Sequence, residues 1–172
     1  MAQTITSTNA KVDLSGGVVY CKALKTGYYA SQVASDTATF GNINLTSATT
    51  LSAGLHEGLV VCMNSATGFT ITLPAATGTG NYFDVLVTTT VTSGNHVCKT
   101  GGSDVLVGVV TTASTATSVA TGCQSTNSTI TMNGTTQGGL KGSWLHFQDV
   151  ASGVWYVEAN LVASGTAANP VS

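Results

Sequence analysis

Residues 58–74 read Gly58-Leu59-Val60-Val61-Cys62-Met63-Asn64-Ser65-Ala66-Thr67-Gly68-Phe69-Thr70-Ile71-Thr72-Leu73-Pro74, and this stretch decides the fold. The run 58–63 is apolar on both faces of a strand, which predicts a strand covered on both sides. After a turn at 64–68, apolar residues alternate with threonines, the period of a half-buried strand. Pro74 ends that strand because it has no N–H to donate to a ladder. The residues expected to share one core are Leu59, Val61, Phe69, Ile71 and Leu73.

The rest of the chain continues this pattern. Threonine and valine pack well on a pleated sheet, and Gly, Ser and Asn recur every eight to twelve residues as turns do. Strands are expected at residues 39–45, 58–63, 69–73, 82–87, 95–98, 104–111, 117–121, 128–132, 143–148 and 154–158, with a strand or connection at 28–33. Asn133-Gly134 predicts a two-residue hairpin turn. The sequence has no repeat of fixed period, which argues against a solenoid or a propeller. The expected fold is all-β: an antiparallel β-sandwich or β-barrel, jelly-roll-like, with short loops.

The composition excludes several classes of protein. Thr, Ser and Gly make up 67 of the 172 residues, and charged residues are 7% of the chain, against about a quarter in ordinary domains. All five basic residues are lysines, too few for a conventional nucleic-acid binder, which needs a dense basic surface to neutralise phosphates. The N-terminal residues lack the basic start and apolar core of a signal peptide, and no apolar run approaches the length of a membrane helix. We expect synthesis in a cytoplasm and no membrane partner.

Two parts of the chain differ in character. Residues 1–26 hold one sustained apolar patch, at 18–21, and three of the five lysines, Lys11, Lys22 and Lys25. A segment with so little apolar surface cannot supply a core, and it is expected to be an arm that lies on the main domain or on a neighbouring subunit. The predicted organisation is an N-terminal arm at 1–26 and a β-domain at 27–172.

Few residues have the spacing of a catalytic or metal site. His56, His96 and His146 are too far apart in sequence for a specific zinc motif, and we expect capping by His56 and a surface or interface position for His146. The four cysteines form no C-x-x-C pair and are expected to be reduced and mostly buried, with a disulfide or metal ligation as alternatives.

The seven acidic residues also lack a recognisable pattern. No Asp-x-Asp spacing supports a calcium site, although one using one or two carboxylates stays an alternative. Asp104 and Asp149 lie at predicted strand ends, where turn roles are usual, whereas Asp84 lies inside a strand beside an aromatic residue. We expect no catalytic residues, no cofactor and no metal site, and we expect that the chain is not an enzyme.

The last predicted hairpin carries the strongest candidate for an interface. Trp144, His146 and Gln148 share one face of a strand, and Leu145 and Phe147 share the other. Trp144 is either an interface anchor, a platform on which a sugar stacks, or a cover for the edge of its own core. The predicted interface residues are Trp144, His146, Lys11, Lys22 and Lys25.

Several stretches resemble segments of structural proteins of tailed bacteriophages. They are residues 59–80, 82–97, 103–108, 141–147, 153–156 and 164–170. The resembling proteins include capsid decoration (cement) proteins and head or tail fibre proteins. The similarity covers roughly residues 40–172 and is a pattern of strands and turns without a catalytic motif.

The resemblance implies a function. It implies a non-enzymatic virion structural protein, a capsid decoration protein that stabilises the major capsid lattice, with the major capsid protein and itself as partners in a homotrimer on the virion surface. The N-terminal arm could attach it there. The alternative is a head or tail fibre, a receptor- or glycan-binding module, with a glycan receptor as partner. An enzyme, such as a depolymerase, is a third reading.

Overall fold

The structure is a computed structural model, and it describes residues 4–7, 10–13 and 42–172. The chain divides into two units, Met1–Phe40 and Gly41–Ser172. The described part of the first unit is an antiparallel hairpin of β1 (Thr4–Ser7) and β2 (Ala10–Asp13), which the sequence did not predict. The expected boundary at residue 26 and the expected strand at 28–33 lie outside the described residues.

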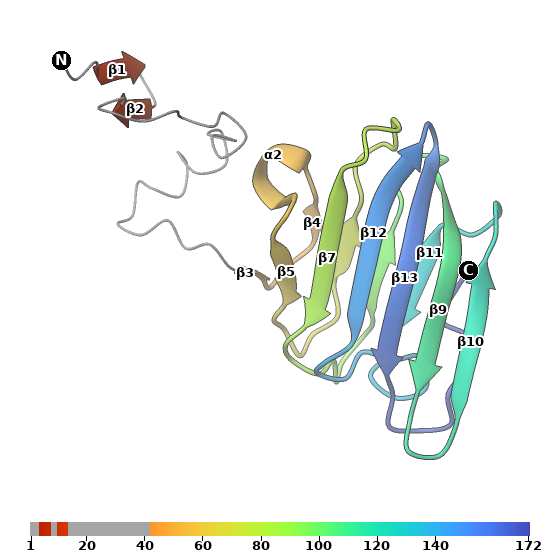
Figure 1. Cartoon of the computed structure of the whole chain (residues 1–172). Helices are drawn as coiled ribbons and strands as arrows, with labels where there is room; N and C mark the ends of the chain where they lie inside the picture. The colour runs from red at the N-terminus through yellow and green to blue at the C-terminus, as the bar shows by residue number, and fades with distance from the viewer. Residues whose placement is uncertain (1–3, 8–9, 14–41) are drawn as a thin grey trace. The chain divides into compact units, whose positions relative to one another are not determined.

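The second unit is almost entirely β-structure, which confirms the expected all-β class (Figure 1). Its elements are β3 (Asn42–Leu45), β4 (Thr49–Thr50), α2 (Ala53–His56), β5 (Val60–Met63), β6 (Thr70–Thr72), β7 (Tyr82–Val87), β8 (His96–Lys99), β9 (Val105–Ala113), β10 (Ser118–Cys123), β11 (Thr129–Met132), β12 (Trp144–Ala151) and β13 (Val154–Val162). Seven strands form one sheet in the order β10-β9-β13-β12-β7-β5-β3, and four form a second in the order β11-β8-β6-β4.

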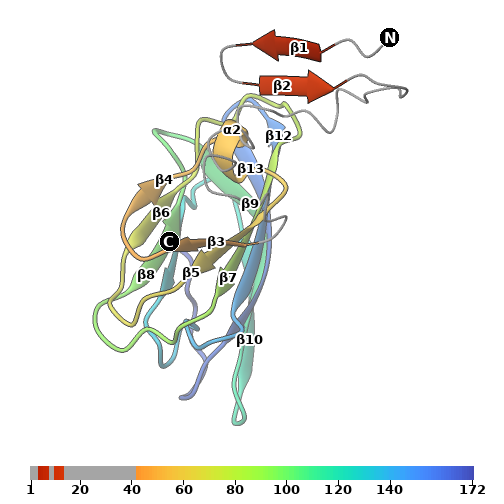
Figure 2. The same ribbon diagram turned by 90° about the vertical axis from the view of Figure 1, so that its left-hand side faces the viewer.

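Both sheets are mixed rather than antiparallel, because the chain changes sheet after each strand from β3 to β8 (Figure 2). Each coil of the chain passes through one strand of each sheet, so successive strands of the same sheet run in the same direction. β3, β5 and β7 therefore pair in parallel, as do β4, β6 and β8. This part winds as a solenoid does, whereas the lack of a fixed-period repeat in the sequence argues against a solenoid. The sequence shows no fixed period because the coils differ in length: β3, β5 and β7 begin at residues 42, 60 and 82.

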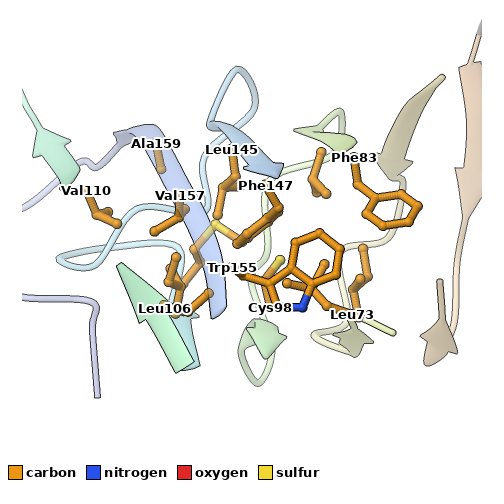
Figure 3. Packing of buried hydrophobic residues seen from close by; sticks show 14 of the residues in the cluster. Leu73, Phe83, Cys98, Leu106, Val110, Leu145, Phe147, Trp155, Val157 and Ala159 are labelled. Carbon is orange, nitrogen blue, oxygen red and sulfur yellow. The ribbon is translucent and has the colours of Figure 1, made fainter. Parts of the chain in front are cut away.

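One hydrophobic cluster joins the two sheets (Figure 3). Its fully buried members include Phe83, Phe147 and Trp155 from the seven-stranded sheet and Cys98 and Ile130 from the four-stranded sheet. The rings of Phe83 and Trp155 have centroids 5.7 Å apart. The indole N–H of Trp155 is also satisfied, since it donates to a carbonyl oxygen in the loop after β6. Each sheet therefore provides the apolar surface that covers the other.

The predicted core of residues 58–73 is confirmed in part. Val61, Ile71 and Leu73 are buried in the cluster, but Phe69 is half-buried at its margin and Leu59 is half-buried outside it. Phe69 instead packs edge-on against the ring of His96, with centroids 4.8 Å apart. It lies just before β6, where the chain has not yet entered the covered part of the sheet.

The stretch after β11 does not form the expected hairpin. β11 and β12 lie in different sheets, so residues 133–143 cross between them. The Asn133 side-chain oxygen accepts backbone N–H bonds from Thr135, Thr136 and Gln137, while Gly134 has the positive φ (75°) that the sequence suggested. The Asn-Gly pair thus starts an Asn-capped loop instead of a two-residue turn.

A buried carboxylate holds the loop between β6 and β7. Asp149 lies at a β-bulge in β12 on the inner face of the sheet and is 2% exposed. It accepts backbone N–H bonds from Thr77, Gly78 and Thr79 at 2.7–3.1 Å and the hydroxyl of Thr79 at 2.8 Å. Burial alone would raise the pKa of Asp149, but the hydrogen bonds outweigh it and lower the pKa to about 2. Asp104 holds the same loop through the N–H of Ala76 at 2.7 Å.

The different burial of two phenylalanines gives a first prediction. Phe83→Ala should lower the free energy of unfolding by about 3–5 kcal/mol, because it leaves a cavity in the shared core. Phe69→Ala should cost about 1–2 kcal/mol, since Phe69 is only partly buried at the margin of the core and its removal leaves a smaller cavity. Urea denaturation followed by circular dichroism measures both. Equal losses for the two variants would contradict the assignment of Phe69 to the margin.

A second prediction concerns acid stability. Asp149→Asn should lower the free energy of unfolding at neutral pH by about 2–3 kcal/mol, since a charged acceptor of several N–H groups is lost and an amide N–H₂ is placed among donors. Because the folded pKa lies below the ordinary value of 3.8, this stability is present above about pH 4 and is lost as the pH falls toward about 2.

Urea denaturation at several pH values between about 2 and 7 tests this, with the exposed Glu158→Gln as the matched control. The wild type and the control should lose stability in this acid range, whereas Asp149→Asn should show a correspondingly flatter dependence. The same acid dependence in Asp149→Asn as in the wild type would show that another group is responsible.

Candidate functional site

Three neighbouring aromatic rings lie on the outer face of the seven-stranded sheet. Tyr82 comes from β7, and His146 and Trp144 come from the neighbouring β12. The His146 ring lies between the other two, with centroids 5.9 Å from Tyr82 and 6.0 Å from Trp144 and interplanar angles of 33° and 19°. We call these three residues the aromatic row.

The row faces away from the core because of the period of two along a strand. In β7 and β12 the residues between those of the row, such as Phe83, Leu145 and Phe147, are fully buried. The row side chains therefore point outward, and Tyr82 keeps 39% of its surface exposed. β12 is the central strand of the seven, so the row lies in the middle of the sheet and far from both edge strands.

A carboxylate fixes the middle ring. Asp84 of β7 lies directly opposite His146 of β12, and its Oδ1 accepts a hydrogen bond from His146 Nδ1 at 2.7 Å. Both side chains are 26% exposed. In the neutral ring this bond assigns the proton to Nδ1 and leaves Nε2 as an acceptor, whereas protonation converts the contact into an ion pair.

The Asp84–His146 pair resembles part of a hydrolase triad, but its surroundings do not complete one. Within residues 42–172, no serine or threonine hydroxyl and no cysteine thiol is hydrogen-bonded to His146. What the arrangement provides is an oriented imidazole with an aromatic ring on either side. Such a surface can stack against a ligand and exchange hydrogen bonds with it.

Polar side chains flank the row. Glu158 and Asn160 of β13 lie opposite His146 and Trp144, and Gln148 of β12 lies opposite Tyr82. All three are exposed and alternate with buried residues, so they share the outer face with the row. Each carries two adjacent hydrogen-bonding atoms in one plane.

The structure excludes one of the three interpretations of Trp144. Its side chain is half-buried on the face opposite Leu145 and Phe147, so it does not cover the edge of its own core. The two other interpretations, an interface anchor and a platform for a sugar, both need an outward ring and both stay open. His146 occupies the surface position that the sequence predicted for it.

The other predicted interface residues are not brought to this site by the described structure. Lys11 lies in β2 of the first unit, and Lys22 and Lys25 lie outside the described residues. Conversely, Tyr82 is not among the residues predicted for a site, and Asp84 stands out in the sequence only for its position inside a strand. The signal was present, since alternation in residues 82–87 puts both on the face opposite the core, but nothing in the sequence pairs that strand with residues 144–148.

The two remaining histidines are structural. Ser52 N–H donates to Nδ1 of the buried His56 across α2, in agreement with the expected capping role. The buried His96 accepts from Phe69 N–H at Nδ1 and contacts the Ser65 carbonyl oxygen at 3.0 Å through Nε2, which suits a neutral ring protonated at Nε2. Burial lowers the pKa of both histidines, and the contacts of their rings with the carbonyl oxygens of Ser52 and Ser65 oppose this only in part.

The cysteines in the described region are free and buried, as expected. These are Cys62, Cys98 and Cys123, while Cys21 lies outside the described residues. Burial raises the pKa of Cys98 to about 12 and that of Cys123 to about 11, so both thiols stay protonated and unreactive at neutral pH. Among the residues that the structure describes, no group of three or more His, Cys, Asp or Glu side chains is placed to hold a metal ion.

In the described part of the chain, no helix has the length and apolar character needed to cross a membrane. Comparisons with protein-family models, with curated proteins and with solved structures gave no match to this chain.

Proposed function

We propose that the chain is a non-enzymatic structural protein of a tailed-bacteriophage virion, a decoration protein on the capsid surface that binds the major capsid protein and other copies of itself. The observation that carries the proposal is the division into a compact β-unit at 41–172 and a separate N-terminal unit with an opposite net charge. The resemblance of residues 40–172 to phage structural proteins supports the same assignment. The two facing sheets would form a β-sandwich, with mixed rather than purely antiparallel pairing.

The charges of the two units suit attachment through the first. Residues 1–40 hold three lysines and two aspartates, a net charge of +1, and residues 41–172 hold two lysines and five carboxylates, a net charge of −3. A basic segment can find an acidic protein surface by electrostatic attraction. The weak charge of the β-unit limits the repulsion between many copies held close together on one shell.

The alternative function is a receptor- or glycan-binding module on a head or tail fibre. The observation that favours it is the aromatic row, which a purely structural protein does not need. Location separates the two functions. Immunogold electron microscopy of virions, with an antibody against the β-unit, should label the head if the chain decorates the capsid, and labelling of the tail or of fibres would overturn that assignment.

A third prediction concerns the N-terminal unit. Deleting residues 1–26 should abolish binding to undecorated capsids and leave the β-unit folded, because the shared core is built from residues 51–171. Deletion of residues 1–40, up to the boundary between the units, should behave in the same way. Co-sedimentation measures attachment, and circular dichroism measures the fold.

Salt dependence provides the control for the charge argument. If Lys11, Lys22 and Lys25 contribute, attachment of the full chain should weaken modestly as salt rises, since three charges are few. Replacing the three lysines with glutamine should remove that dependence, whereas Lys99→Gln plus Lys141→Gln in the β-unit should retain it. Full co-sedimentation of the truncated protein would show that the β-unit makes the contact itself.

A fourth prediction concerns assembly. We expect a homotrimer, since several large apolar side chains of the second unit are exposed and would be covered in an oligomer. Outside the aromatic row, these side chains are Leu55, Val109, Val150, Tyr156 and Val162. Light scattering on the purified chain should give about three times the monomer mass. A monomer at every concentration, with threefold density also absent from a reconstruction of the virion, would contradict it.

A further inference from the structure

We infer that the aromatic row binds a neutral carbohydrate chain, with its rings stacked on Tyr82, His146 and Trp144. This goes beyond the decoration role, because it assigns a ligand class to a particular face of the β-unit. It deepens the alternative function, but it holds equally for a protein on a head or on a fibre.

The row suits an elongated ligand that contacts the stacked Trp144–His146 pair and the tilted Tyr82 ring together. The two outer rings lie on either side of His146 at nearly equal spacings of 5.9 and 6.0 Å, and the rings are inclined to it by no more than 33°. The C–H groups on one face of a sugar ring form such an apolar surface, and aromatic side chains offer large rigid contact areas at low entropic cost. Because the row lies on two hydrogen-bonded strands, little ordering is needed when a ligand binds.

The surroundings of the row suit hydroxyl groups. Gln148, Glu158 and Asn160 are exposed on the same face, and each has two hydrogen-bonding atoms that can pair with neighbouring hydroxyls. The bond from His146 to Asp84 directs Nδ1 to the carboxylate and leaves Nε2 for another partner. The site therefore combines apolar rings with donors and acceptors, the two kinds of surface that a sugar presents.

The charges argue against an anionic ligand. Asp84 lies in the site and Glu158 is opposite His146, while none of the seven strands of this sheet contains a lysine or arginine. Of the two lysines in residues 41–172, Lys99 lies in β8 of the other sheet and Lys141 lies in the loop before β12. A phosphate or sulfate group on this face would be repelled by the two carboxylates, and no strand of the sheet carries a cation to attract it. A neutral saccharide is therefore the better match.

The same carboxylates argue against a second copy of the chain as the occupant. A second copy that covered the row would take Asp84 and Glu158 out of water. Burying two carboxylates on a sheet whose strands carry no lysine or arginine is costly, whatever the symmetry of the contact. The exposed apolar residues Val109 and Val162, on β9 and β13, are better placed for contacts between copies.

The chain contains its own reporter for this binding. It has two tryptophans, of which Trp144 lies in the row and Trp155 is 1% exposed in the core. A sugar stacked on the row should change the fluorescence of Trp144 and leave that of Trp155 unchanged. Neutral polysaccharides (dextran, galactomannan, soluble starch and a β-glucan) serve as probes, with alginate as the anionic comparison.

The experiment uses the full chain and measures affinity electrophoresis and tryptophan fluorescence with each probe. At least one neutral polysaccharide should bind, and alginate should not. Trp144→Ala and Tyr82→Ala should each weaken binding about tenfold or more, since each removes one stacking surface. Trp144→Phe should retain most of the affinity, because it keeps an aromatic ring at this position. Leu55→Ala removes an exposed apolar side chain in α2, outside the row, and should have no effect.

Each contrary result has a definite meaning. Failure of every neutral polysaccharide to bind, unchanged affinity in Trp144→Ala with the fold intact, or preferential binding of alginate would overturn the inference. Loss of self-association in Trp144→Ala, without sugar binding by the wild type, would instead assign the row to a protein interface. None of these results depends on where the protein lies in a virion, so labelling of virions tests the decoration role separately.

Discussion

The two sheets of this protein cannot fold independently, because the chain leaves one sheet for the other after each strand from β3 to β8. Neighbouring strands within a sheet are therefore separated by a whole coil, and no local hairpin can form in this part of the chain. The apolar faces of both sheets meet in one cluster, in which Phe83 and Phe147 of the larger sheet pack with Cys98 and Ile130 of the smaller. Stability must be highly cooperative as a result, since loss of one sheet exposes the inner face of the other.

The shared core uses only the inner face of the seven-stranded sheet. Along β7 and β12, every second residue points inward and belongs to the core. The residues between them point outward and form the aromatic row and its polar neighbours. The backbone that carries the row is held by hydrogen bonds to strands on both sides, since β12 is the central strand. A binding surface built in this way is rigid before a ligand arrives, which reduces the entropic cost of binding.

The few charges of the β-unit have specific structural positions. Among its carboxylates, Asp149 and Asp104 hold the loop between β6 and β7, and Asp84 orients His146. A charged group with several N–H partners contributes far more than an exposed ion pair. The chain therefore keeps a hydroxyl-rich, weakly charged surface while using its carboxylates where the local structure needs an acceptor.

The sequence by itself determined the all-β class, most strand positions and the inward or outward orientation along each strand. The alternation of Phe83 and Val85 with Tyr82 and Asp84 is a local property, since neighbouring residues of any strand point to opposite faces. Only the tertiary structure decided which strands are neighbours, because pairing depends on contacts between residues distant in the chain. Three features depend on which strands are neighbours. They are the parallel pairing, the hydrogen bonds from the amides of residues 77–79 to Asp149, and the bond between Asp84 and His146, which are 62 residues apart. The aromatic row exists for the same reason: β7 and β12 each contribute rings to a surface that neither strand could form alone.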